Sequence, residues 1–340
     1  MEIRFPAEWE KQDGILLSWP HQDTDWSQIL DQVEPLYLSI AAAVSRFEKV
    51  LIIAPDISDL GDRLAAAGAQ TANIGLFEID TNDTWVRDYG PISIYEKSIA
   101  VPLDFQFNGW GERFEYRLDN QATSRLADYG LFAAGSRSVP MILEGGSIET
   151  DGKGSLLTTS RCLLNQNRNP AMTKNDIETA LASTIGIEQF LWLESGMLHG
   201  DDTDAHVDIL ARFAPNDTIL YTSCDNRHDA HFVELEAMRR ELESFRTTRG
   251  ERFNLVPLPL PAPKIDSSGK RLAATYANFL IINDAVLVPV YDDPKDDTTC
   301  QIIASTFPER EVIPINCLPL ISQGGSLHCA TMQLPEGVLA

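Results

Sequence analysis

The sequence predicts a mixed α/β protein built from about five similar units arranged around a common centre. Short β-rich runs alternate with helical patterns along all 340 residues. Residues 144–148 (EGGSI) and 323–327 (QGGSL) are nearly the same pentapeptide, 179 residues apart. Stretches rich in reactive side chains are spaced similarly, because Asp88, Glu144, His206 and Cys329 are separated by 56, 62 and 123 residues. Five units of about 60 residues use roughly 300 residues, and a ring of them brings these positions together.

Each element follows from its local pattern. β-branched and apolar runs predict strands over 50–54, 98–104, 155–159 and 219–223, and a hairpin over 279–290 that turns at Asn283-Asp284. Helical periodicity predicts helices over about 26–47, 58–67, 174–185, 230–245 and, more weakly, 298–307. Thr173 and Asp176 form a capping box that begins the third helix. The proline-rich stretch 256–263 is typical of an edge-like strand that enters a loop.

The composition indicates how many domains, which cellular location and which kinds of partner to expect. No linker or low-complexity tract divides the chain, so we expect a single domain over 1–340. Apolar runs are too short to cross a bilayer, and the first residues lack the order of a signal peptide, which predicts a cytoplasmic location. The net charge of −23 argues against nucleic acid or an anionic membrane as a partner. It is compatible with a small cationic substrate, and equally with solubility alone.

Neither a disulfide framework nor a metal site is expected. The five cysteines (162, 224, 300, 317 and 329) include no C-x-x-C pair, and a buried cysteine is usually inert. Residues 201–208 (DDTDAHVD) are rich in oxygen ligands, but Val207 and Phe213 stand where a calcium loop needs glycine and glutamate. His199 and His206 lie seven residues apart, without the spacing of a zinc hydrolase. We therefore predict no metal and no other cofactor.

Five residues form a plausible reactive set. His206 and Asp208 would share one face of a strand, and a histidine beside carboxylates has a raised pKa that suits proton donation. Asp88, ahead of a Gly-Pro turn, is either a turn residue or a fixed carboxylate at the end of a strand. Glu144 precedes two glycines that allow a crowded site. Cys329 is either a packing residue or a nucleophile. A thiolate with a histidine and several acids suits attack on a cationic carbon, and carboxylates pair naturally with a guanidinium, so the set points to a guanidine substrate.

These residues lie in blocks through which the chain closely resembles the agmatine deiminase family, which is related to bacterial peptidylarginine deiminases. The resemblance implies a pentein fold, a five-bladed α/β propeller with pseudo-fivefold symmetry. The matching blocks run nearly from end to end: 6–9 (PAEW), 82–91 (NDTWVRDYGP), 107–111 (FNGWG), 144–148 (EGGSI), 202–208 (DTDAHVD), 276–279 (YANF), 292–294 (DDP) and 324–329 (GGSLHC).

The resemblance also implies the chemistry. Cys329 would attack the guanidinium carbon to form a covalent amidino-thioether. His206 would protonate the departing ammonia and then activate water, while Glu144 orients His206. No metal takes part in this branch of the family.

The same resemblance implies how the substrate binds. Asp88 and Asp208 would each grip guanidinium nitrogens, and Trp85 would either cover the guanidinium face or pack in the core. Two departures from the family pattern touch the backbone of the site. Ala205 stands where the family often has Gly, and Ser326-Leu327 where it often has Asn-Ile. They leave open how the far end of the substrate is bound.

The expected enzyme is a hydrolase of C–N bonds in linear amidines that converts agmatine, a polyamine precursor, and water to N-carbamoylputrescine and ammonia. A peptidylarginine deiminase and a free-arginine deiminase stay open, the latter with Arg87 or Arg113 on the substrate carboxylate. Amidino transfer to an amine is a rival mechanism. A catalytically silent propeller used for binding is the alternative from another class, and a homo-oligomer is compatible with all of these.

Overall fold

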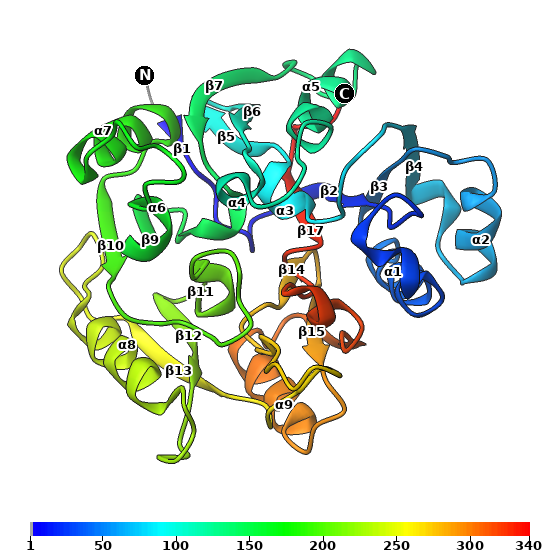
Figure 1. Ribbon diagram of the computed structural model, residues 1–340. Coiled ribbons are helices and arrows are strands. Elements are labelled where there is room, and N and C mark those ends of the chain that lie inside the picture. Colours follow the sequence, from blue (N-terminus) through cyan, green and yellow to red (C-terminus); the bar gives the residue numbers. More distant parts are fainter. Residues whose placement is uncertain (1–2) are drawn as a thin grey trace.

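The structure, a computed structural model, describes residues 3–340, whose strands form five small sheets around a common centre (Figure 1). Each sheet contains an antiparallel pair of strands next to a parallel pair. Parallel strands need a long crossover connection, and here each crossover carries a helix. The repeated unit is therefore strand, strand, helix, strand, and this unit accounts for the period near 60 residues.

The strands of the five sheets have the following order and bounds. The first is β1 (Ile3–Arg4), β5 (Ile92–Glu96), β6 (Ile99–Gln106) and β7 (Arg137–Ile142); the second is β10 (Gln189–Leu193), β9 (Ser155–Thr159) and β8 (Ile148–Thr150). The third is β11 (Ala211–Ala214), β12 (Thr218–Ser223) and β13 (Asn254–Pro259); the fourth is β14 (Leu280–Ile282), β15 (Ala285–Val290) and β16 (Glu311–Asn316). The fifth is β17 (Thr331–Pro335), β2 (Gln12–Ser18), β3 (Lys49–Ala54) and β4 (Ile74–Glu78).

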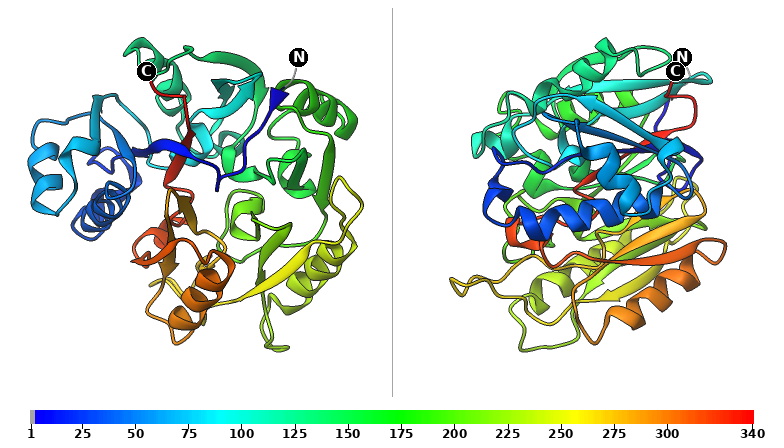
Figure 2. Two further views of the ribbon diagram at one scale, coloured as in Figure 1. Left: turned by 180° about the vertical axis from the view of Figure 1, so that it is seen from behind. Right: turned by 90° about the vertical axis from the view of Figure 1, so that its right-hand side faces the viewer.

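The longer helices lie at the periphery of the ring (Figures 1 and 2). They are α1 (Leu30–Val44), α2 (Leu60–Ala66), α5 (Ala122–Asp128), α7 (Lys174–Ile185), α8 (Phe232–Ser244) and α9 (Asp296–Thr306). Shorter helical turns lie nearer the centre or in the connections: α3 (Val86–Tyr89), α4 (Gly109–Glu112), α6 (Ser160–Leu163), η1 (Asp25–Gln28), η2 (Thr71–Asn73), η3 (Asp119–Gln121), η4 (Gly145–Ser147), η5 (Val207–Ile209) and η6 (Leu320–Gln323).

Most expected elements are present near their predicted bounds. β9 and α7 match to the residue, and Thr173 and Asp176 form the capping box. The 279–290 hairpin turns at Asp284, and the proline-rich stretch supplies β13 at the edge of its sheet. The single helix expected over 26–47 is wrong, because η1 ends at Gln28 and α1 begins at Leu30.

The backbone at two site residues also differs from the expectation. His206 and Asp208 lie at and within the turn η5 rather than on a strand. Asp88 lies in the short helix α3, ahead of β5, rather than at the end of a strand. Both stretches enter a strand directly afterwards, so a pattern of few residues does not separate the turn from the strand that follows it.

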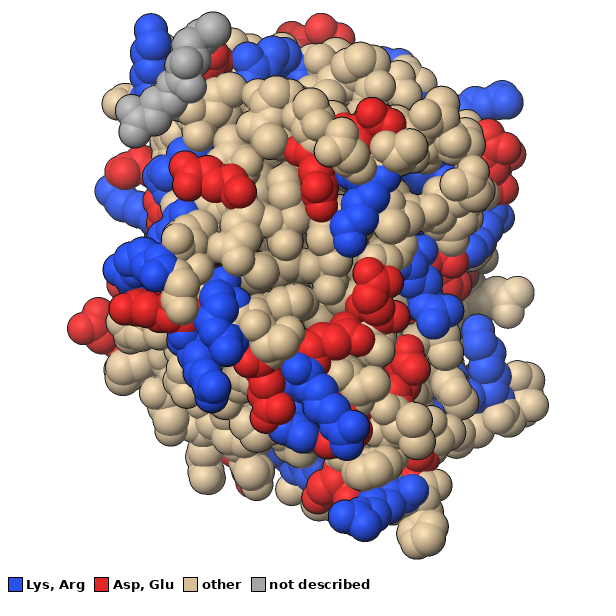
Figure 3. Space-filling view, turned by 90° about the vertical axis from the view of Figure 1, so that its left-hand side faces the viewer, with Lys and Arg blue, Asp and Glu red and all other residues tan. Residues whose placement is uncertain are grey.

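The core is a continuous cluster of buried hydrophobic side chains that connects the sheets with the peripheral helices. In β2, Ile15, Leu16 and Leu17 are fully buried, since both faces of this strand are covered. The last strand, β17, pairs antiparallel with β2 and so closes the ring of sheets. On the face shown in Figure 3, acidic and basic side chains intermingle. Within residues 3–340, no helix combines the length and apolar composition needed to cross a membrane.

Candidate active site

The five residues predicted to be reactive come together near the centre of the ring. They come from separate units: α3 supplies Asp88, the start of η4 supplies Glu144, η5 and the residue before it supply Asp208 and His206, and the turn before β17 supplies Cys329. All five side chains belong to buried residues. Burying four ionisable groups and a thiol together costs free energy unless the groups are paired. Their hydrogen-bond and ion-pair partners therefore indicate what the site can bind.

Glu144 and His206 form a buried ion pair. Glu144 Oε2 lies 2.9 Å from His206 Nε2. The Arg168 guanidinium holds the same carboxylate from the other side, with Nε 3.0 Å from Oε1 and Nη2 3.1 Å from Oε2. Burial alone would raise the pKa of Glu144, but His206 and Arg168 lower it. Glu144 is therefore an ionised carboxylate that fixes the ring of His206.

His206 presents its other ring nitrogen to the site. Within the described residues Nδ1 has no hydrogen-bond partner, and it lies 3.6 Å from Asp88 Oδ1. Burial alone would lower the pKa of His206, but Asp88, Cys162 and Glu144 raise it well above its ordinary value. The resting ring is thus an imidazolium, whose Nδ1–H has no hydrogen-bond partner among the described residues.

Asp88 is held in place by two donors. Its Oδ1 accepts the backbone N–H of Gly146 at 2.9 Å, and its Oδ2 accepts the indole N–H of Trp110 at 2.9 Å. Burial, aided by Glu144 and Asp208 and opposed by His206, raises the pKa of Asp88 to about 6. The carboxyl is ionised at neutral pH, where a cation beside it would be stabilised.

The glycine pair of the 144–148 motif makes this crowding possible. A Cβ on Gly146 would lie 2.6 Å from His206 Nδ1, 2.9 Å from Asp88 Oδ1 and 3.1 Å from Asp208 Oδ2. A Cβ on Gly145 would lie 2.2 Å from the carbonyl oxygen of Arg87. Only a residue without a side chain lets these groups converge, as the sequence predicts.

Cys329 lies between an amide and a carboxylate. Its Sγ is 3.3 Å from Asn278 Nδ2 and 3.6 Å from Asp208 Oδ2. Burial, Asp208 and Asp88 raise the pKa of Cys329 well above its ordinary value, so the empty site holds a neutral thiol. Asp208 has a lowered pKa, because His328, His206 and Arg212 together outweigh its burial. Its Oδ1 has no partner among the described residues.

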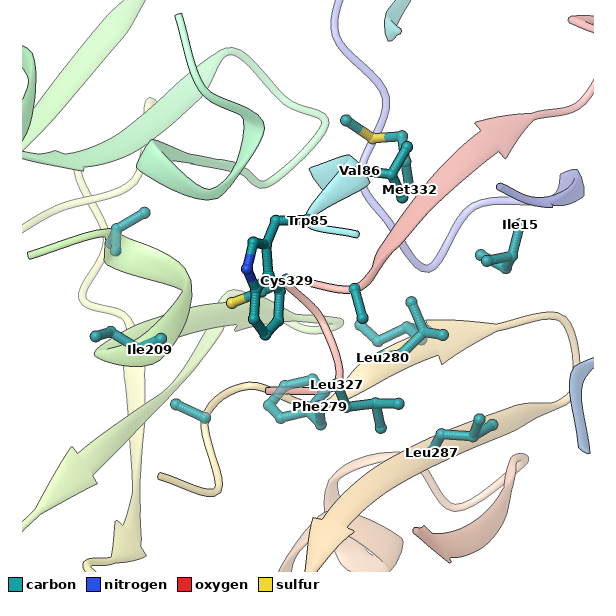
Figure 4. Packing of buried hydrophobic residues seen from close by; sticks show 14 of the residues in the cluster. Ile15, Trp85, Val86, Ile209, Phe279, Leu280, Leu287, Leu327, Cys329 and Met332 are labelled. Carbon is teal, nitrogen blue, oxygen red and sulfur yellow. The ribbon is translucent and has the colours of Figure 1, made fainter. Parts of the chain in front are cut away.

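Trp85 both packs and lines the site. Its ring is buried against Trp26, with centroids 5.5 Å apart, and a Cβ on Gly325 would lie 2.4 Å from it. Figure 4 shows the ring beside Cys329, above the apolar side chains of Phe279 and Leu327. Trp85, Asp88, Trp110 and Cys329 border a cavity of about 230 Å³. The two roles considered for Trp85 are therefore compatible.

Sequence reasoning missed four polar residues of the site. Asn278 and Trp110 lie within the blocks 276–279 and 107–111, and His328 lies directly before Cys329, so a signal existed for these three. Arg168 stands in the stretch 165–169 (NQNRN), which carries no such pattern. Its role is visible only from its contacts with Glu144, Asp204 and the carbonyl oxygen of Thr203.

One group of side chains has the geometry of metal ligands. Ligand atoms of Glu144, Cys162 and His206 lie within 4.8 Å of one another. However, both carboxylate oxygens of Glu144 already accept hydrogen bonds from Arg168, and a guanidinium repels a metal cation. The cluster therefore does not fit a metal and is explained as support for His206.

Comparison with known proteins agrees with the fold. The agmatine deiminase of Pseudomonas aeruginosa (strain LESB58) is 32% identical over 356 residues, covering 98% of this chain and 95% of that protein. A structure of a cysteine-to-serine variant of the C. jejuni agmatine deiminase with substrate bound is 39% identical with a TM-score of 0.91, covering 99% and 97% of the two chains.

A dimethylarginine dimethylaminohydrolase, 12% identical with a TM-score of 0.54, covers 95% of this chain and 100% of its own, and is alike in fold alone. The five sheets and this likeness agree with the pentein fold. Residues 4–335 match the family described as Porphyromonas-type peptidyl-arginine deiminase. The chain belongs to this family.

Proposed function

We propose that the protein is an agmatine deiminase that hydrolyses agmatine to N-carbamoylputrescine and ammonia. The observation that carries this proposal is the meeting of the Cys329 thiol with His206 and the carboxylates of Asp88 and Asp208 beside an acid-lined cavity. The agmatine deiminases among its relatives support the same substrate. A planar guanidinium satisfies both carboxylates by paired hydrogen bonds, so Asp88 and Asp208 bind the substrate and place its carbon near Cys329 Sγ.

The bound cation activates the nucleophile. The acids beside Cys329 disfavour a thiolate in the empty site, and a guanidinium between them offsets their charge and lowers the cost of ionising the thiol. The thiol releases its proton to solvent as the cation binds, and the resulting thiolate attacks the guanidinium carbon and forms a C–S bond. His206 donates its proton to the departing nitrogen, the C–N bond breaks, and ammonia leaves an amidino-thioether on Cys329.

The second half of the reaction uses the same groups in reverse. His206, now neutral, takes a proton from water, and the resulting hydroxide attacks the carbon of the amidino group. The C–S bond breaks, Cys329 leaves as a thiolate and takes up the proton that the carbon-bound hydroxyl gives up, and the product carries a urea group. Glu144 and Arg168 hold the His206 ring in one orientation through both steps.

The cavity favours agmatine over free arginine. Besides Asp88, its acidic lining residues are Asp25, Asp83, Asp202 and Asp266, and Lys270 is the one Lys or Arg in the described part of the chain that lines it. Such a lining attracts the distal ammonium of agmatine and repels the α-carboxylate of free arginine.

The two arginines considered for binding an α-carboxylate are engaged elsewhere. Arg87 is buried, with Nε donating to the carbonyl oxygen of His328 at 3.3 Å and Nη1 to the side chain of Gln333. Arg113 pairs with Asp204 and donates to the carbonyl oxygen of Asp202. These contacts favour a substrate tail that carries an amine rather than a carboxylate.

The test is ammonia release by the purified protein, without added metal, from agmatine, free arginine and an arginine-containing peptide in parallel. Turnover of agmatine that is lost in Cys329→Ala supports the proposal. Turnover of the peptide or of arginine alone would assign the protein to a different deiminase activity. Product formation that requires an added amine would identify amidino transfer, and silence with all substrates would indicate a binding protein.

A further inference from the structure

His328, the residue directly before the nucleophile, lies between two buried carboxylates. Its Nδ1 is 2.8 Å from Asp208 Oδ2, and its Nε2 is 2.8 Å from Glu8 Oε2. Ionised carboxylates only accept hydrogen bonds, so both ring nitrogens donate. The ring thus links Asp208, whose Oδ2 lies 3.6 Å from Cys329 Sγ, to a second acid, Glu8.

That second acid is itself fixed. Glu8 Oε2 also accepts from Arg212 Nη2 at 2.6 Å, and Glu8 Oε1 accepts the backbone N–H of Ile281 at 2.7 Å. Arg212 in turn pairs with Glu149 through Nε at 2.9 Å. The pKa of Glu8 is held well below its usual range because Arg212 and His328 outweigh its burial. Glu8, Glu149, Arg212, His328 and Asp208 are all buried, so this network is rigid.

The network lies behind the substrate cavity. Glu8 and His328 line a separate small cavity of about 30 Å³ and are not among the residues that border the acid-lined cavity. Their influence on the substrate therefore acts through the residues they hold.

The two residues next to the Cys329 sulfur, Asn278 and Asp208, are each held by hydrogen bonds that involve this network or a neighbouring residue. The backbone N–H of His328 donates to Asn278 Oδ1 at 2.9 Å, and Arg212 Nη1 donates to the carbonyl oxygen of Phe279 at 2.7 Å. The His328 ring binds Oδ2 of Asp208, the same oxygen that lies 3.6 Å from Cys329 Sγ. This hydrogen bond restrains rotation of the carboxylate and so keeps Oδ2 beside the sulfur.

We propose that His328, backed by Glu8, is a positioning residue that holds the Asp208 carboxylate beside Cys329 Sγ, where it binds the substrate guanidinium. The inference rests on the proposed function only in that the substrate carries a guanidinium. Glu8, which lies in the PAEW block and touches no reacting atom, then affects catalysis through His328.

Two substitutions at one position separate positioning from packing. In His328→Asn the amide nitrogen stands where Nδ1 stood and still donates to Asp208. In His328→Gln the amide nitrogen stands where Nε2 stood and donates to Glu8 instead. Both replace the ring by a neutral amide, so each variant is the matched control of the other. Glu8→Gln keeps the ring of His328 and removes the charge behind it.

Steady-state kinetics with agmatine should distinguish them. For His328→Gln we expect KM to rise by roughly tenfold to a hundredfold, the range that corresponds to losing one hydrogen bond to a charged group, with a smaller change in kcat. His328→Asn should recover most of this loss, and Glu8→Gln should lie between the two. Calorimetric binding of agmatine in a Cys329→Ala background should rank the variants in the same order. Thermal denaturation reports whether each variant is folded.

Two results would overturn the inference. One is a wild-type KM and kcat in folded His328→Gln. The other is an equal loss in both variants that follows their melting temperatures, which would indicate packing alone. If the wild type turns over arginine or the peptide and not agmatine, the proposed function fails, and the same comparison is made with that guanidine.

Discussion

Replacing Gly146 by alanine tests whether the site is as crowded as the structure shows. The added Cβ would stand 2.6 Å from His206 Nδ1 and 2.9 Å from Asp88 Oδ1, whereas ordinary contact begins near 3.4 Å. Gly146 does not have a positive φ, so the substitution adds no backbone strain and its effect is steric. The side chains around it must move apart by about 0.8 Å at the closest pair.

This displacement sets the size of the expected effect. Misplacing reacting groups by roughly 1 Å costs about a hundredfold in rate. A hundredfold loss corresponds to about 2.7 kcal/mol of transition-state stabilisation. We therefore expect Gly146→Ala to lower kcat/KM for agmatine by about a hundredfold, because the added methyl group stands beside the groups that hold the guanidinium.

The assay is ammonia release over a range of agmatine concentrations, with melting temperature measured on the same samples. Gly61→Ala is the matched control. Gly61 lies inside α2, and a Cβ there would meet nothing closer than 3.8 Å, the Leu76 Cδ1 atom. The control should keep wild-type kinetics and gain about 0.5–1 kcal/mol in stability, since alanine is favoured over glycine in a helix.

A folded Gly146→Ala variant with a kcat/KM within threefold of the wild type would refute this prediction. That result would mean that Asp88 and His206 do not need their present separation. A loss of activity in both Gly146→Ala and Gly61→Ala would show instead that the enzyme responds to any change of glycine.

Three further predictions concern the nucleophile, a substrate-binding acid and stability. Cys329→Ala should abolish ammonia release yet still bind agmatine in calorimetry, since Asp88 and Asp208 remain; any residual turnover would assign the nucleophile elsewhere. The value of kcat/KM should fall as pH drops below about 6, because protonation of Asp88 removes a partner of the guanidinium; a rate profile flat down to pH 5 would contradict this assignment. Burial raises the pKa of Asp119 to about 8, so the folded protein holds this proton more tightly than the unfolded chain does. The free energy of unfolding should therefore fall as pH rises from about 6 to 8, and Asp119→Asn should reduce that slope in denaturant titrations; equal slopes would refute this contribution.

Sequence patterns indicate the residues proposed to react better than the groups that hold them. Cys329, His206 and Asp88 stand in short blocks whose residue types already indicate a reaction, and a period near 60 places them at one centre. Arg168 and Glu8 act through contacts with residues 24 and 320 positions away, respectively Glu144 and His328. No local pattern encodes a pairing of that kind.

In the secondary structure, likewise, most long elements are predicted well from the sequence and short turns are not. The pattern over 174–185 has a capping box and one apolar face, and it matches α7 to the residue. The turn that carries Asp208 is only three residues long and leads directly into β11. A periodicity of two or of 3.6 residues cannot be established over so short a segment, so the sequence does not separate the turn from a strand.

The closure of the ring by β17 and β2 has a consequence for how activity is gained and lost. Cys329 stands two residues before β17, and Glu8 stands four residues before β2. Pairing of these strands brings the nucleophile to the acids of the other units, so no fragment that lacks either strand assembles the site. During refolding, catalysis should therefore appear only after these most distant segments of the chain have joined, and turnover can serve as a direct report of that joining.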